Sequence, residues 1–232
     1  MIESLIEGAT RFRRGFHSKN RQRFTELVEQ GQNPHTLFIT CADSRVLPHA
    51  MTRANPGDIF VLRNVGNMVP PCSSATPCNS TGAAIEYATS VLKVHEIVVC
   101  GHSHCGACAA LYARDDHDGD LEMTRRWLEQ GRAVRDLVLR EASTDFDNVT
   151  PIFRSREDKE QLLRATEKAM VVQHLSNLMT YPAVARRVAE RTLRLHGWHY
   201  TIESGRIECY DPDRHCFVPV DSRHGELVLR RA

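Results

Sequence analysis

The chain has 232 residues, with 30 basic and 29 acidic side chains and a net charge of +1. Its length suffices for one domain with a well-buried core, and its balanced charge creates no global field that would attract nucleic acid or a membrane surface. No stretch approaches the about 18 consecutive apolar residues of a membrane-spanning helix. The N-terminus carries Glu3 and Glu7 and lacks the apolar core of a secretory signal. We therefore expect a cytoplasmic protein.

The first part of the chain predicts helices followed by buried strands. Residues 1–34 predict a helical arm of two stretches interrupted near Gly15, which stops at Gly31 and Pro34. Three apolar runs are each typical of a strand buried on both faces of a parallel sheet. They cover residues 36–42, 59–62 and 96–100.

The remaining elements are mostly helical. Helical spacing predicts helices over residues 82–93, 105–113, 121–142, 157–179 and 182–195. Near the end of the chain, strands at 198–202 and 206–210 flank a Glu-Ser-Gly turn and predict a hairpin. Strands that alternate with helices indicate an α/β fold, with a mainly parallel β-sheet flanked by helices. We expect a single domain over residues 1–232, composed of an arm (1–34) and an α/β core with a C-terminal hairpin (35–232).

Two short motifs follow two of the predicted buried strands. CADSR begins at Cys41, and GHSHC ends at Cys105. In an open parallel sheet, ligands gather outside the carboxyl ends of the strands, so both motifs are expected on the same rim. Cys41, His102 and Cys105 then supply two thiolates and one imidazole. This donor set suits Zn²⁺ in tetrahedral geometry and leaves the fourth position for water.

Asp43 and Arg45 lie close to the first proposed ligand. A guanidinium can grip a carboxylate with two parallel hydrogen bonds and keep it ionised. The carboxylate of Asp43 could accept a hydrogen bond from water on the metal, as in an active enzyme. Alternatively, Asp43 could fill the fourth position itself and act as a fourth ligand in a closed, inactive state.

Other interpretations of these residues stay open. A purely structural zinc site is one, although structural zinc usually sits on paired Cys-x₂-Cys knuckles. Cys105 and Cys108 match such a knuckle or a redox pair, but Cys108 falls in an Ala-rich helix where small cysteines commonly pack. His104 could shuttle protons or simply lie on the surface.

The chain holds eight cysteines, and without an export signal disulfides are the weaker interpretation. We expect two of the eight to bind metal and Cys100 to lie in the core. We do not expect a disulfide between the two loop cysteines, Cys72 and Cys78. We also do not expect one between the two C-terminal cysteines, Cys209 and Cys216.

The motifs Cys-x-Asp-Ser-Arg and Gly-His-Ser-x-Cys-Gly resemble those of the β-class carbonic anhydrases. The stretches NPGDIFVLRNVGNMVPP, GAAIEYATSVLKVHEIVV and SNLMTYPAVARR are also similar to that family, and the plant-type branch is the most similar. The resemblance implies a zinc lyase that reversibly hydrates carbon dioxide to bicarbonate and a proton. It also implies a homodimer or higher homo-oligomer, in which N-terminal helices embrace the partner.

The resemblance further implies a set of substrate-binding residues, which are Gln32, Phe60, Val65, Tyr87 and Gly106. The other branch of the family has a bicarbonate-sensing tryptophan three residues before the first zinc cysteine, where this chain has Phe38. This difference favours a site that stays open. Two alternatives remain: hydrolysis of carbonyl sulfide or carbon disulfide on the same scaffold, and a non-catalytic module that senses bicarbonate.

Overall fold

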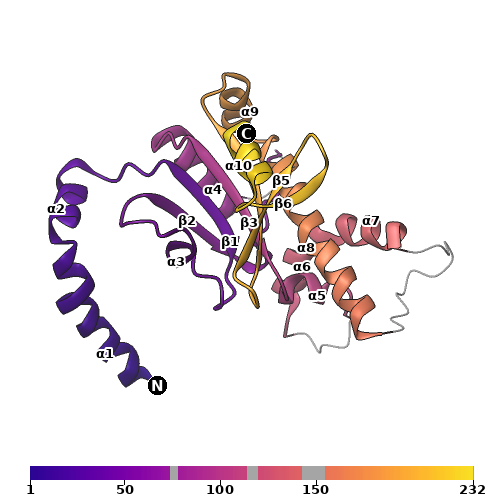
Figure 1. Cartoon of the computed structure of the whole chain (residues 1–232), viewed down its shortest axis with the longest axis horizontal. Helices are drawn as coiled ribbons and strands as arrows, with labels where there is room; N and C mark the ends of the chain where they lie inside the picture. Colours follow the sequence, from indigo (N-terminus) through magenta and orange to yellow (C-terminus); the bar gives the residue numbers. More distant parts are fainter. Residues whose placement is uncertain (74–77, 114–119, 143–154, 232) are drawn as a thin grey trace.

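A six-stranded sheet forms the centre of the molecule (Figure 1). The computed structural model describes residues 1–73, 78–113, 120–142 and 155–231. The sheet order is β2-β1-β3-β4-β5-β6. The first four strands in this order run parallel: β2 (Ile59–Asn64), β1 (Thr36–Cys41), β3 (Glu96–His102) and β4 (Arg194–Thr201). The strands β5 (Arg206–Asp211) and β6 (Cys216–Pro219) are antiparallel. The predicted α/β class and mainly parallel sheet are confirmed.

The two faces of the sheet are covered unequally. Alternate residues of β1 and β3, such as Leu37 and Ile97, face the main core. That core is closed by α4 (Ser80–Glu86) with its π-helical continuation Tyr87–Val91, by α8 (Arg156–Leu178) and by α9 (Pro182–Ala189). The opposite face has a small cluster around Phe38, Val98 and Cys100. Among the described residues, Met51 of the short α3 (Pro48–Thr52) is the only helical side chain in that cluster.

The N-terminal arm extends away from the sheet (Figure 1). It consists of α1 (Ile2–Phe12), a π-helical turn at Arg13–His17 and α2 (Arg21–Gln30). Within the described chain, no residue of α1 or α2 is buried. Ile2, Leu5 and Ile6 are 63%, 68% and 61% exposed. Apolar side chains left exposed on α1 indicate a face meant for another surface.

Two predicted helices differ from the observed ones. The stretch 121–142 is divided into α6 (Glu122–Leu128), a 3₁₀ turn at Glu129–Gly131 and α7 (Arg132–Ala142). The break allows close packing, because a Cβ on Gly131 would lie 3.0 Å from Leu111 and 3.3 Å from Met170. The helix predicted to reach residue 195 ends at Ala189, since pairing of β4 with β3 overrides the helical spacing of its last residues.

Three short elements were not predicted, whereas the C-terminal hairpin was. The helix α3 and the edge strand β6 are too short to show a periodic pattern, and α10 (Arg223–Arg231) is a helix that the sequence analysis did not include. The hairpin of β4 and β5 is confirmed, and β4 starts four residues earlier than predicted. Residues of α5 (Gly106–Ala110) and α7 pack together with Cys41 and Cys105 in a second core cluster. Over the ranges described here, no helix combines the length and the apolar character needed to cross a bilayer.

Candidate metal centre

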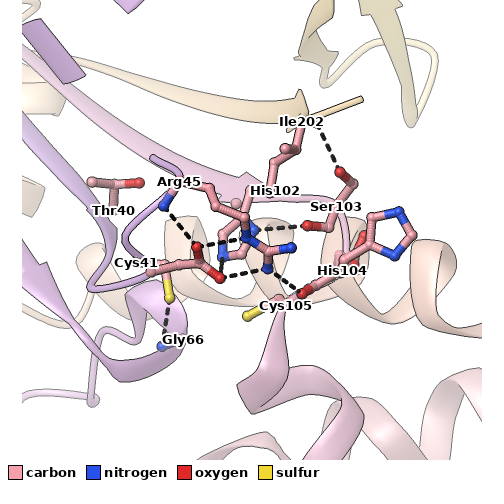
Figure 2. Close-up of polar contacts among 12 residues, drawn as sticks. Thr40, Cys41, Arg45, Gly66, His102, Ser103, His104, Cys105 and Ile202 are labelled. Atoms are coloured by element: carbon pink, nitrogen blue, oxygen red, sulfur yellow. Dashed lines mark hydrogen bonds and ion pairs between the residues drawn. The ribbon is translucent and has the colours of Figure 1, made fainter. Parts of the chain in front are cut away.

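Three potential metal ligands meet at the carboxyl ends of the two central strands. Cys41 is the last residue of β1 and His102 the last of β3, and these strands are neighbours in parallel register. Cys105 follows after a tight turn and directly precedes α5. The ligand atoms of Cys41, His102 and Cys105 all lie within 4.8 Å of one another, and all three residues are buried (Figure 2). The topology therefore brings distant residues to one point.

The imidazole of His102 is arranged to bind a cation. Its Nδ1 lies 2.8 Å from the carbonyl oxygen of Ser103, to which it donates a hydrogen bond. Its buried Nε2 has no hydrogen-bond partner among the described residues. An unpaired buried nitrogen is costly, and a neutral imidazole nitrogen is a common zinc ligand. His102 thus has one nitrogen fixed and the other available for a metal ion.

The two thiols also fit a metal ion better than an empty pocket. The hydrogen bond with Cys105, together with burial, raises the pKa of Cys41 to about 12. Contact with the thiol of Cys108, together with burial, raises the pKa of Cys105 to about 12. Without a cation, two adjacent thiolates are unfavourable, whereas a divalent ion would stabilise both. Two thiolates and an imidazole are the donors that zinc prefers.

The loop after β2 supports Cys41 through its backbone. The N–H of Gly66 lies 3.4 Å from the Sγ of Cys41 and donates to it. Gly66 has a φ of 77°, and a Cβ there would lie 2.8 Å from the Cβ of Ala107. Glycine is therefore required for this approach. Arg63 donates to the carbonyl oxygens of Cys41 at 3.0 Å and Asp43 at 2.6 Å, which holds the chain between these two residues.

Asp43 and Arg45 form the predicted two-pronged pair beside the ligands. The Nε and Nη2 of Arg45 donate to the two carboxylate oxygens of Asp43 at 2.9 and 2.7 Å. These hydrogen bonds hold the pKa of Asp43 well below its usual range. One Asp43 oxygen lies 4.0 Å from the Nε2 of His102. Asp43 is therefore an ionised acceptor next to the ligand group, held by Arg45 rather than included in that group.

Two of the expected substrate-binding residues lie at this end of the sheet. Val65 follows β2 and is 45% exposed, and its carbonyl oxygen accepts a hydrogen bond of 2.7 Å from Trp127 Nε1. Gly106 directly follows Cys105. Around the position that a Cβ of Gly106 would take, no described atom outside its neighbours and its own helix lies within 4 Å. Val65, next to Gly66, and the start of α5 therefore lie beside the ligands, and the position of a Cβ on Gly106 is open.

The other three expected residues lie elsewhere in the chain. Phe60 pairs with Leu37 on β1, four positions before Cys41, which corresponds to about 13 Å along a strand. The ring of Tyr87 lies 6.0 Å from that of Phe60 and is 43% exposed. Gln32 is exposed and precedes the amino end of β1. Within one chain, these side chains do not meet the ligand group.

The remaining candidate residues are cysteines outside the ligand group and His104. Cys108 and Cys100 are buried in the core, and all eight cysteines are free thiols. His104 is exposed, with its Nε2 3.6 Å from Glu203.

Sequence reasoning missed Trp127 and Glu167, the latter an acceptor for the backbone N–H of Cys105. The detectable signal for Glu167 was a carboxylate on the buried stripe of a predicted helix.

Comparisons with known proteins agree with this geometry. The carbonic anhydrase family profile matches residues 36–207. A carbonic anhydrase of Synechocystis sp. is 40% identical over 226 residues, which cover 97% of this chain and 77% of the relative. One of Pseudomonas aeruginosa is 37% identical over 226 residues, which cover 97% and 94%.

Solved structures give the same result. The β-carbonic anhydrase CcaA has a TM-score of 0.84 and 40% identity, with 96% of this chain and 93% of the other covered. Tetrameric β-carbonic anhydrase of Sordaria macrospora has a TM-score of 0.75 and 29% identity, with 94% and 98% covered. With the ligand geometry and these similarities together, the chain belongs to the β-class carbonic anhydrases.

Proposed function

We propose that this chain reversibly hydrates carbon dioxide to bicarbonate and a proton, with Zn²⁺ held by Cys41, His102 and Cys105. The observation that carries the proposal is the meeting of these three donors, one of them an unpartnered imidazole nitrogen, beside an ionised carboxylate. Zinc bound there would supply a Lewis acid that makes water nucleophilic near neutral pH. Everything else in the reaction is the work of the surrounding residues.

Asp43 orients the attacking water in this mechanism. Because Arg45 occupies both of its oxygens from one side, Asp43 stays ionised and points an acceptor toward the ligand group. Accepting one water hydrogen directs an oxygen lone pair at the carbon atom. The backbone N–H of Gly106, at the start of α5, is available to a substrate oxygen. Val65 contributes an apolar wall.

We further propose a homodimer as the basic unit. Gln32, Phe60 and Tyr87 are remote from their own chain's ligands, and they are at least partly accessible. The arm exposes apolar residues of α1, and one face of the sheet has little helical cover. In a dimer, the arm of one subunit would pack on the other, and these three residues would complete the apolar pocket at the partner's metal centre.

Neighbouring functions are less well supported. The relatives described above are named carbonic anhydrases, which supports carbon dioxide rather than carbonyl sulfide or carbon disulfide as substrate. A non-catalytic sensor would not need the Asp43–Arg45 pair. The eight free thiols support the cytoplasm, a reducing compartment, as the location.

The test measures zinc content and stopped-flow carbon dioxide hydration on the same purified sample. We expect close to one zinc per chain and rapid hydration that disappears when zinc is removed and returns when it is restored. Carbonyl sulfide and carbon disulfide are assayed in parallel. Zinc-loaded protein that hydrolyses either sulfur compound but leaves carbon dioxide unchanged would contradict the proposal.

A further inference from the structure

A buried carboxylate lies directly behind one of the three ligands. Glu167, on α8, is 3% exposed. Its Oε1 accepts a hydrogen bond of 3.1 Å from the backbone N–H of Cys105. The approach of α8 depends on Gly101 of β3, where a Cβ would lie 2.7 Å from a methyl group of Val171. A carboxylate is costly to bury, so its contact with the backbone of a ligand requires an explanation.

The second oxygen of Glu167 is held by two donors. The Nε2 of His199 lies 3.1 Å from Oε2, and the Nη1 of Arg164 lies 3.0 Å from it. His199 is fully buried on β4, next to Gly101 in the sheet register. Arg164 supplies the opposite charge. The Glu167 side chain is therefore fixed from both α8 and the sheet before it contacts Cys105.

The peptide group between His104 and Cys105 is gripped at both of its ends. Its N–H donates to Glu167, and its carbonyl oxygen accepts a hydrogen bond of 3.0 Å from the Nη2 of Arg45. His104 has a φ of 56°, in the left-handed region that non-glycine residues rarely adopt. Two charged side chains thus hold a peptide whose preceding residue is strained. The orientation of this peptide sets the direction in which the Cys105 side chain leaves the backbone.

We propose that Glu167 is a positioning residue for the metal centre, which acts by clamping the His104–Cys105 peptide against Arg45. Arg45 also holds Asp43, so the same clamp aligns the ligand Cys105 with the carboxylate that faces the ligands. The inference rests on the zinc enzyme proposed above. A purely structural role for Glu167, as a tie between α8 and β4, is the alternative.

The test compares zinc release from three holoprotein variants. E167M keeps the approximate volume but removes the acceptor, and E167Q keeps one acceptor oxygen. E208Q is the matched control, because Glu208 lies 3.9 Å from the other nitrogen of His199 and pairs with Lys168, yet no contact joins it to Cys105 in the described structure. Zinc transfer to a chromogenic chelator and the thiolate-to-metal charge-transfer bands of the Co²⁺-substituted proteins are measured alongside carbon dioxide hydration.

We expect zinc release from E167M to be faster by about 10- to 100-fold, with altered charge-transfer bands. E167Q should lie within a few-fold of wild type, and E208Q should match wild type. Should E167M fail to fold, E167D replaces it. The shortened carboxylate keeps its charge but withdraws from Cys105, so E167D should release zinc faster than E167Q.

Two outcomes would overturn the inference: folded E167M that releases zinc at the wild-type rate, or E167D that retains zinc better than E167Q. Because these readouts need no turnover, they separate from the proposed function. Wild-type protein that binds zinc without hydrating carbon dioxide would overturn the function and leave the clamp measurable. Wild-type protein that binds no zinc would overturn both.

Discussion

The two ends of the parallel sheet differ in how complete they are within one chain. At the carboxyl end, Cys41, His102 and Cys105 are buried together and braced by backbone hydrogen bonds. At the amino end, Phe60 and Tyr87 contact each other, but Tyr87 stays exposed and the adjoining arm buries nothing. The ligand group is therefore complete within one chain, whereas the substrate pocket proposed above depends on the proposed second chain.

The largest expected effect comes from removing a ligand at the complete end. Cys41→Ala leaves two protein donors, so the protein should lose its zinc and its hydration rate should fall to the uncatalysed background. Metal analysis and stopped-flow assay on the same sample check this. Cys216→Ala, which removes an exposed thiol, is the control and should retain both. Zinc retained in full by Cys41→Ala would place the metal elsewhere.

The next effect separates binding of the metal from its use. Asp43→Ala should keep zinc but slow hydration by about 100-fold or more, because the attacking water loses its acceptor. Arg45→Ala should act in the same direction by about 10- to 100-fold, since it frees Asp43 and the His104 carbonyl oxygen. Metal analysis checks that Asp43→Ala keeps its zinc, and stopped-flow kinetics measure the hydration rates of both variants. If Asp43→Ala strips the metal, Asp43 is itself a ligand in the resting protein.

A smaller effect tests the incomplete end. Ile6→Asp places a charge on the apolar side of α1, where Ile6 is 61% exposed in the single chain. We expect subunit dissociation, retained zinc and a loss of about tenfold or more in hydration, because each missing apolar contact in a substrate pocket costs about 1–3 kcal/mol. Light scattering coupled to size exclusion measures the mass. Arg11→Asp puts the same acid on the opposite side of α1 and should remain a dimer.

A full-activity monomer of Ile6→Asp would break the comparison, because it would mean that one chain completes its own pocket. An unchanged dimer with unchanged activity would show instead that the apolar side of α1 does not mediate association.

The smallest effect concerns stability far from the metal. His224 Nε2 lies 2.5 Å from Oδ2 of Asp211, and Arg214 lies 4.0 Å from the same oxygen. The hydrogen bond from His224 lowers the pKa of Asp211. A carboxyl group whose pKa is lower in the folded than in the unfolded protein stabilises the fold at pH values above the unfolded-state pKa of about 3.9. This stabilisation is lost as the pH falls through the folded-state pKa. Asp211→Asn should therefore lower the urea midpoint at pH 7, with the gap to wild type narrowing toward pH 3.

Zinc content and hydration activity of Asp211→Asn at pH 7 should match wild type, because this pair contacts neither end of the parallel strands in the described structure. A stability gap that widens toward pH 3 would reverse the sign of the linkage.

Much of the architecture was readable from local patterns. The apolar runs at 36–42 and 96–100 became β1 and β3, because buried parallel strands need nearly continuous apolar residues. The prediction of one helix over 121–142 was wrong. The helix breaks at Gly131 because Leu111 and Met170 pack closely there, which helical periodicity does not reveal. The start of β4 was missed because its pairing partner, β3, lies far away in sequence. The single-domain division stays a prediction.

Residue types and spacing alone predicted the donors for zinc and the Asp43–Arg45 pair. They also predicted that both motifs lie at the same edge of the sheet, because each follows a parallel strand. These depend on side-chain chemistry and on a rule of sheet topology, both of which are local or general. Only the folded chain showed that Gln32, Phe60 and Tyr87 lie away from the ligands, and that Glu167 and Arg45 grip one peptide. Such facts arise from the register of paired strands and the approach of a distant helix, which no single stretch of sequence encodes.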